Sequence, residues 1–104
     1  MNTHFAIPMF EALASAVRLD IVRLLVTYGT DGLIAGDIAH SLNIPPTNLS
    51  FHLKNLVQAG LVYSTQEGRY QRYTINVNAI NNLIGFLTAE CCSQQSPPDS
   101  TCCF

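Results

Sequence analysis

The sequence predicts a mainly α-helical domain that carries one β-hairpin, an α+β fold. Up to residue 60, apolar residues recur at the spacing of helices. Residues 61–77 are instead rich in Val, Tyr, Thr and Ile around a polar turn, and a last apolar stripe follows them. The 104 residues are 48% hydrophobic and 12% charged, so they form one small folded domain and not a disordered chain.

The first stretch, "MFEALASAVRLDIVRLLVTYG", predicts two helices that are separated at Ser15. Phe10, Leu13 and Ala14 form a short apolar stripe on the first of them. Ser15 suits the N-cap of the second helix because its hydroxyl can accept a hydrogen bond from an unpaired backbone N–H. That second helix is expected to end at Gly29.

Two further helices are predicted in the middle of the chain. A turn at Asp31-Gly32 leads to a short helix over residues 35–42. The next helix begins at Pro46, where the missing N–H costs nothing, and stops at Gly60. Its apolar face, which we expect to be buried, consists of Leu49, Leu53, Leu56 and Val57.

The stretch "LVYSTQEGRYQRYTINV" predicts a β-hairpin that turns over residues 66–69. "NAINNLIGFLTAE" predicts a last helix, whose apolar residues fall at i, i+3, i+4 and i+7 from Ile80 to Leu87. Beyond Glu90 the sequence turns to Ser, Gln and Pro-Pro, which end a helix. Residues 1–90 are therefore predicted to form the folded domain, and residues 91–104 a separate tail.

Charge is unevenly distributed along the chain. The formal net charge is −2, but residues 45–75 sum to +2 because Lys54, Arg69 and Arg72 are opposed only by Glu67. The segments on either side each sum to −2. A phosphate backbone responds to local charge, so the middle segment is the part predicted to contact nucleic acid.

Two short helices with a tight connection, followed by a hairpin with a basic tip, predict a winged helix-turn-helix. The second of these helices is expected to enter the major groove of double-stranded operator DNA. Winged helices also serve as protein–protein modules, but an exposed Phe51 among amides and a lysine favours contact with bases and phosphates. The residues predicted to contact DNA are Thr47, Asn48, Ser50, Phe51, His52, Lys54, Asn55, Arg69 and Arg72.

Four stretches together resemble the ArsR/SmtB family of metalloregulatory repressors: "ALASAVRLDIVRLL", "GDIA", "SFHLKNLVQAGLV" and "EGRYQRYTI". The resemblance covers residues 9–90, and its most specific part runs from Ser50 to Val62. It implies a homodimer, joined through the first and last helices, that leaves DNA when an ion binds. The residues expected at the dimer interface are Phe10, Leu13, Ile80, Leu83, Ile84 and Leu87.

All four cysteines lie in the tail as two adjacent pairs, Cys91-Cys92 and Cys102-Cys103. The family's common Cys-Val-Cys arsenic site is replaced here by "LIAGD" at residues 33–37, and its zinc site on the last helix lacks His and acidic ligands. A third arrangement in the family places an adjacent cysteine pair after the last helix and another cysteine in the tail. Cys91 and Cys92, with Cys102 or Cys103, resemble this arsenic(III)-responsive variant.

The chemistry of arsenic(III) agrees with this interpretation. The ion is soft and prefers thiolates, here three sulfurs in a pyramid. A turn at 97–99 can return the tail towards Cys91 and Cys92. Because adjacent residues on a helix point about 100° apart, we expect binding to fray the end of the last helix and so to displace the recognition helices. The inducer is then arsenite or a methylated arsenical, with no organic cofactor.

Other interpretations of the four thiols stay open. Four thiolates also suit tetrahedral zinc or cadmium, and exposed thiols suit a repressor that is switched by oxidation. Structural disulfides are less favoured, because the absence of a signal-like N-terminus predicts a cytoplasmic protein, where thiols stay reduced. The sequence contains no apolar run of about 18 residues, so no membrane-spanning segment is predicted. No enzyme is expected, since His4, His40 and His52 belong to no recognisable catalytic pattern.

Overall fold

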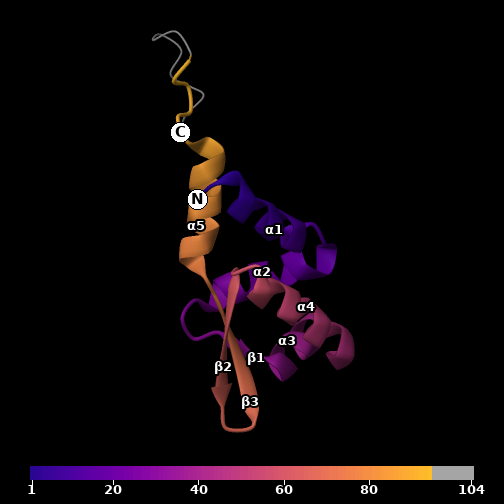
Figure 1. Cartoon of the computed structure of the whole chain (residues 1–104). Coiled ribbons are helices and arrows are strands. Elements are labelled where there is room, and N and C mark those ends of the chain that lie inside the picture. Colours follow the sequence, from indigo (N-terminus) through magenta and orange to yellow (C-terminus); the bar gives the residue numbers. More distant parts are fainter. Residues whose placement is uncertain (95–104) are drawn as a thin grey trace.

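The computed structural model describes residues 1–94, and the predicted winged helix-turn-helix is confirmed (Figure 1). Five helices and three strands follow one another within this part of the chain. In order they are α1 (Thr3–Leu13), α2 (Ala16–Tyr28), β1 (Leu33–Ile34), α3 (Ala35–Leu42), α4 (Pro46–Gln58), β2 (Val62–Glu67), β3 (Tyr70–Ile75) and α5 (Val77–Thr88).

The break between the first two helices lies where the sequence predicts it. The Ser15 hydroxyl accepts a hydrogen bond from the Arg18 backbone N–H at 3.4 Å, and Gly29 caps the end of α2 with φ +56°. The start of α1 was predicted too late, at Met9. The helix begins at Thr3, because the Asn2 side chain accepts from the Phe5 N–H, and it continues through Pro8.

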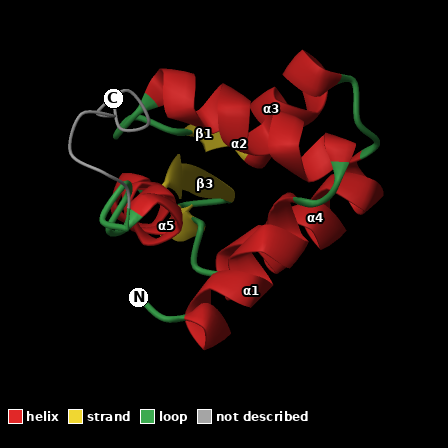
Figure 2. Cartoon of the chain, turned by 90° about the horizontal axis from the view of Figure 1, so that it is seen from above, coloured by secondary structure: helices red, strands yellow, loops and turns green. Residues whose placement is uncertain are grey.

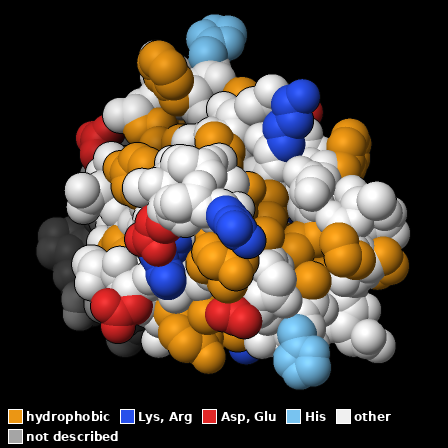
Figure 3. Space-filling model, turned by 90° about the horizontal axis from the view of Figure 1, so that it is seen from below, with side chains coloured by type: hydrophobic (Ala, Val, Ile, Leu, Met, Phe, Trp, Pro, Cys, Tyr) orange, Lys and Arg blue, Asp and Glu red, His pale blue; other side chains and the backbone are white. Residues whose placement is uncertain are grey.

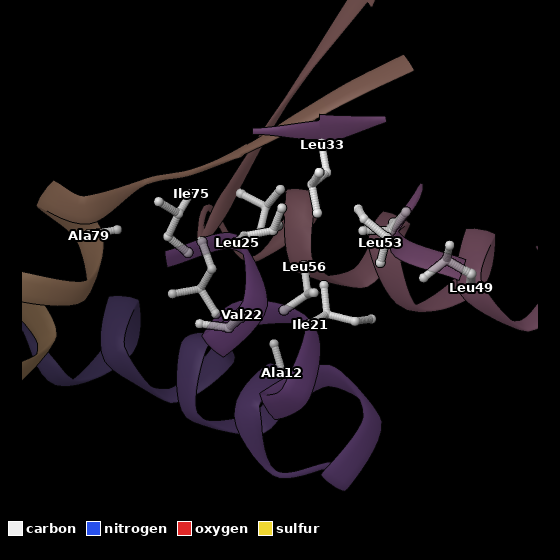
Figure 4. Packing of buried hydrophobic residues seen from close by; sticks show 13 residues of the cluster. Ala12, Ile21, Val22, Leu25, Leu33, Leu49, Leu53, Leu56, Ile75 and Ala79 are labelled. Carbon is white, nitrogen blue, oxygen red and sulfur yellow. The ribbon is translucent and has the colours of Figure 1, made fainter. Parts of the chain in front are cut away.

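One hydrophobic core joins the helices to the sheet (Figure 4). Leu49, Leu53 and Leu56 of α4 point into it, as their spacing predicts. They pack with Ile21 and Leu25 of α2, and no polar or charged side chain is buried in the part of the chain that the structure describes. Because three leucines hold one face of α4 inside, its opposite face must lie at the surface.

The sheet contains a strand that the sequence pattern did not predict. β1 pairs with β3 in an antiparallel arrangement, so the strand order is β1-β3-β2. Gly32, directly before β1, has φ +63°, and a Cβ there would collide with the Tyr73 carbonyl oxygen. The hairpin is also tighter than expected, since β2 runs to Glu67 and only Gly68 and Arg69 form the turn.

α5 projects away from the sheet, towards the end of the molecule where the N-terminus lies (Figure 1). Its start is capped by Asn76, whose side chain accepts from the Ala79 N–H and donates to the Gly60 carbonyl. Seen from above, α5 lies end-on next to β3, while α1 packs against α2 and α4 (Figure 2). None of the helices in residues 1–94 is long and apolar enough to cross a membrane.

Candidate nucleic-acid interface and thiol site

The open face of α4 presents most of the residues that were predicted to contact DNA. Thr47, Asn48, Ser50 and Lys54 are exposed, and the Phe51 ring is 63% exposed although its neighbours Leu49 and Leu53 are buried. Ser50 donates its hydroxyl hydrogen to the Pro46 carbonyl in the preceding turn. An exposed aromatic ring among small polar side chains is suited to contact with base edges in a groove.

Two predicted contacts lie elsewhere on α4. His52 is half-buried, and its Nδ1 lies 3.3 Å from Nη1 of Arg18 in α2. Asn55 is also half-buried and lines a hollow between α1 and α4, together with Glu11 and Arg18. The predicted set is therefore divided between the open face and the side that packs towards α1 and α2.

The two wing arginines differ in their surroundings. Arg69 is exposed at the hairpin turn and makes no hydrogen bond or ion pair with the described residues. Arg72 donates from Nε to the Glu67 carboxylate at 2.8 Å and from Nη1 to the Asp31 carbonyl at 3.0 Å. The prediction treated both as phosphate contacts, but Arg72 also ties the wing to the turn before β1.

Polar side chains organise the other face of the hairpin. Ser64 donates to Oε1 of Gln71, whose amide donates to Gln66, and Gln66 in turn donates to the Gly68 carbonyl. This chain of hydrogen bonds crosses the two strands and ends at the turn. It links the two strands to the turn that carries Arg69.

Figure 3 views the molecule from the wing side. Lys and Arg side chains are interspersed there with carboxylates and with hydrophobic side chains, and do not form one continuous basic surface. The local positive charge of residues 45–75 thus comes from a few separated cations. Individual basic residues should then have clearly different effects on DNA affinity.

The residues predicted to form a dimer interface fall into two groups. Ile84 and Leu87 of α5 are 55% and 63% exposed, whereas Leu83 is only 4% exposed within the chain. Phe10, Leu13 and Ile80 are half-buried. The sequence pattern missed Phe5, which is 68% exposed on α1, because the first helix was not expected to extend that far.

The cysteine pair follows α5 and does not lie on it. α5 ends at Thr88, the Cys91 N–H donates to the Thr88 carbonyl, and Glu90 and Cys92 have φ of +58° and +66°. Such left-handed residues cannot continue a helix, so the pair lies in a turn after α5, and the separation of about 100° expected of neighbours on a helix does not apply to the two thiols. The two sulfurs are 3.5 Å apart.

Both of these cysteines are in disulfide linkage, but not with each other, because an S–S bond is only about 2.05 Å long. Cys102 and Cys103, the other predicted ligands, lie outside the described residues. Within residues 1–94, no group of three or more His, Cys, Asp or Glu side chains is arranged to hold a metal ion. The described residues thus contribute two of the predicted sulfur ligands.

The α3–α4 pair on a common core, together with the β2–β3 wing, defines a winged helix-turn-helix DNA-binding protein. A family profile described as a helix-turn-helix domain matches residues 13–64. The arsenical resistance operon repressor of Bacillus subtilis (strain 168) is 30% identical over 95 residues, which cover 90% of this chain and 86% of that protein. The chain belongs to the ArsR family of transcriptional regulators, which bind DNA and are not enzymes.

Other relatives agree with this assignment. The transcriptional repressor SdpR of Bacillus subtilis (strain 168) is 32% identical over 79 residues, or 76% of this chain and 84% of that protein. Among solved structures, an ArsR-like transcriptional regulator from Rhodococcus sp. RHA1 has a TM-score of 0.71 and 27% identity, over 81% of this chain and 76% of that one. HlyU from Vibrio cholerae N16961 has a TM-score of 0.67 and 27% identity, and the match covers 88% of this chain and 99% of the HlyU chain.

Proposed function

We propose that the protein is a dimeric transcriptional repressor that releases operator DNA when arsenic(III) binds its C-terminal thiolates. The observation that carries the proposal is the adjacent pair of sulfurs, 3.5 Å apart, directly after α5. It is supported by the similarity to a relative that is named an arsenical resistance operon repressor.

The spacing of the two sulfurs suits a single thiophilic ion. Two sulfurs bound to one zinc ion at tetrahedral geometry are about 3.8 Å apart, given Zn–S bonds of about 2.3 Å. The 3.5 Å separation of the Cys91 and Cys92 sulfurs is close to that value, so both thiolates would be near enough to bind one ion once their disulfide linkages are reduced. Cys102 or Cys103 supplies the third sulfur of a pyramidal arsenic site.

The dimer is proposed to form through α1 and α5. In the single chain these helices expose Phe5, Ile84 and Leu87 to solvent. Full burial of each such side chain contributes about 1.5–3 kcal/mol. A second copy of the chain would cover them and would place two recognition helices on one DNA duplex.

Coupling between ligand and DNA follows from the place of the thiols. Only Ala89 and Glu90 separate α5 from Cys91, and both belong to the turn that follows the helix. An ion that draws this turn towards the tail changes the environment of the dimer helix. Because half-sites lie about 34 Å apart, a small rotation between protomers disturbs both major-groove contacts. Binding of the ligand then weakens binding of DNA, and binding of DNA weakens binding of the ligand.

The test is a titration of the reduced protein on operator DNA with arsenite, followed by fluorescence anisotropy, with zinc in a parallel titration. Arsenite should release the DNA and zinc should do so poorly. X-ray absorption should find three sulfurs around arsenic. A four-sulfur zinc site that alone controls release would contradict the proposal.

A thiol-oxidation switch on the same fold is the second candidate, because Cys91 and Cys92 are in disulfide linkage in the structure. Oxidation would lock the same turn that the ion is proposed to draw in. Comparison of operator affinity between the reduced and oxidised protein, with no arsenite present, separates the two. A difference of tenfold or more, about 1.4 kcal/mol, would favour the oxidation switch.

A further inference from the structure

Arg18 links three helices at the junction of α1 and α2. It lies half-buried in the first turn of α2, and its Nε donates to the Ala12 carbonyl at 2.7 Å. That carbonyl belongs to the last turn of α1, where helix carbonyls lack an intrahelical partner. The Nη1 atom of the same guanidinium lies 3.3 Å from Nδ1 of His52, in the middle of α4.

This geometry determines where the imidazole proton lies. A guanidinium donates hydrogen bonds and has no acceptor, and it stays protonated in proteins. Nδ1 of His52 must therefore accept with its lone pair, and the proton of the neutral ring is on Nε2. The Nε2–H group is then left as a donor on the other side of the ring.

The orientation of His52 also concerns its neighbour on the open face of α4. The rings of Phe51 and His52 meet edge to face, with centroids 5.9 Å apart and an interplanar angle of 69°. Phe51 is 63% exposed and was predicted to touch a base. A change in the orientation of the His52 ring would therefore alter the packing of Phe51, which is proposed to contact a base in the groove.

We propose that Arg18 is a positioning residue for sequence-specific DNA binding: it holds His52 in the tautomer protonated on Nε2 and seats α4 against the α1–α2 junction. The DNA part of this inference rests on the proposed function, whereas the tautomer does not. Since α1 also carries the exposed Phe5, the same guanidinium connects the proposed dimer helix to the recognition helix.

The first test needs no DNA. The ¹⁵N chemical shifts of the His52 ring, measured at a pH where the ring is neutral, distinguish a protonated from an unprotonated nitrogen. The wild-type protein should show Nδ1 unprotonated and Nε2 protonated, and Arg18→Met should shift the ring towards a mixture. Protonated Nδ1 in the wild type, or unchanged shifts in Arg18→Met, would overturn the proposal.

The second test compares the affinity for an operator fragment with that for a random duplex. Arg18→Met should weaken operator binding about tenfold, as expected for a lost hydrogen bond to a charged group, and random-duplex binding by less than about twofold. Arg23→Met is the matched control, because Arg23 is exposed on the same helix and makes no hydrogen bond or ion pair with the described residues. It removes the same charge and should leave the ratio of the two affinities unchanged.

A coupling measurement separates positioning from a general structural effect. In a His52→Leu background, Arg18→Met should cause little further loss of operator affinity, since leucine offers the guanidinium no acceptor. Additive losses, or equal weakening of operator and random DNA, would contradict the positioning role. A wild-type protein that fails to discriminate operator from random DNA would contradict the proposed function alone, and the tautomer measurement would still decide the Arg18–His52 link.

Discussion

The wing offers a sharp test, because its two arginines carry the same charge in different environments. Arg69 is exposed at the turn, whereas the Arg72 guanidinium is held by the Glu67 carboxylate and the Asp31 carbonyl. A phosphate contact contributes about 0.9 to the slope of log affinity against log salt concentration. We therefore expect Arg69→Ala to reduce the slope and Arg72→Ala to leave it nearly unchanged.

The expected magnitude follows from the symmetry of the proposed dimer. When each of the two wings loses one phosphate contact, the slope falls by about 1.8. The loss of DNA affinity between 50 and 200 mM salt should then be about tenfold smaller in Arg69→Ala than in the wild type. Arg72→Ala breaks an ion pair that is about one-third exposed on the arginine side, which costs at most about 1 kcal/mol of folding stability. Its effect on DNA affinity should come from a looser wing and be similar at all salt concentrations.

The assay is fluorescence anisotropy with a labelled operator at four or more salt concentrations. Glu67→Gln is the control: it removes the carboxylate that neutralises Arg72, so the slope should become steeper and binding at low salt tighter. If Arg72→Ala reduces the slope as much as Arg69→Ala does, Arg72 contacts phosphate in the complex and the reasoning from its ion pair is refuted.

Three further changes test other parts of the molecule. Leu87→Glu, on the exposed side of α5, should shift the protein from dimer to monomer in sedimentation velocity, whereas Asn81→Glu, at another exposed position of α5, should not. Cys91→Ser should abolish the release of DNA by arsenite without weakening DNA binding when arsenite is absent. Cys102→Ser or Cys103→Ser alone should retain arsenite-induced release. A full arsenite response in Cys91→Ser would reject the mechanism. Gly32→Ala should lower the free energy of unfolding, measured in urea, by about 1–3 kcal/mol, because Gly32 has φ +63° and an added Cβ would meet the Tyr73 carbonyl. Gly36→Ala is the control and should be neutral or stabilising, because Gly36 lies in a helix with open space around it.

The sequence alone determined the features that depend on near neighbours along the chain. The Ser15 cap, the Gly29 helix end and the bounds of α3 arise from hydrogen bonds and φ preferences within a few residues, so their residue types predicted them. The buried face of α4 was predictable in the same way, because the helical period alone places Leu49, Leu53 and Leu56 on one side.

Only the tertiary structure decided which of the predicted side chains are available for binding. β1 has two residues and exists only because it pairs with β3, about forty positions further along the chain. Arg72 is held by Asp31 and His52 by Arg18 through contacts that span 41 and 34 positions. The apolar stripe of α5 looks uniform in sequence, yet packing buries Leu83 and leaves Leu87 exposed. Each of these outcomes depends on the position of a distant segment, and a local pattern of residue types carries no information about that position.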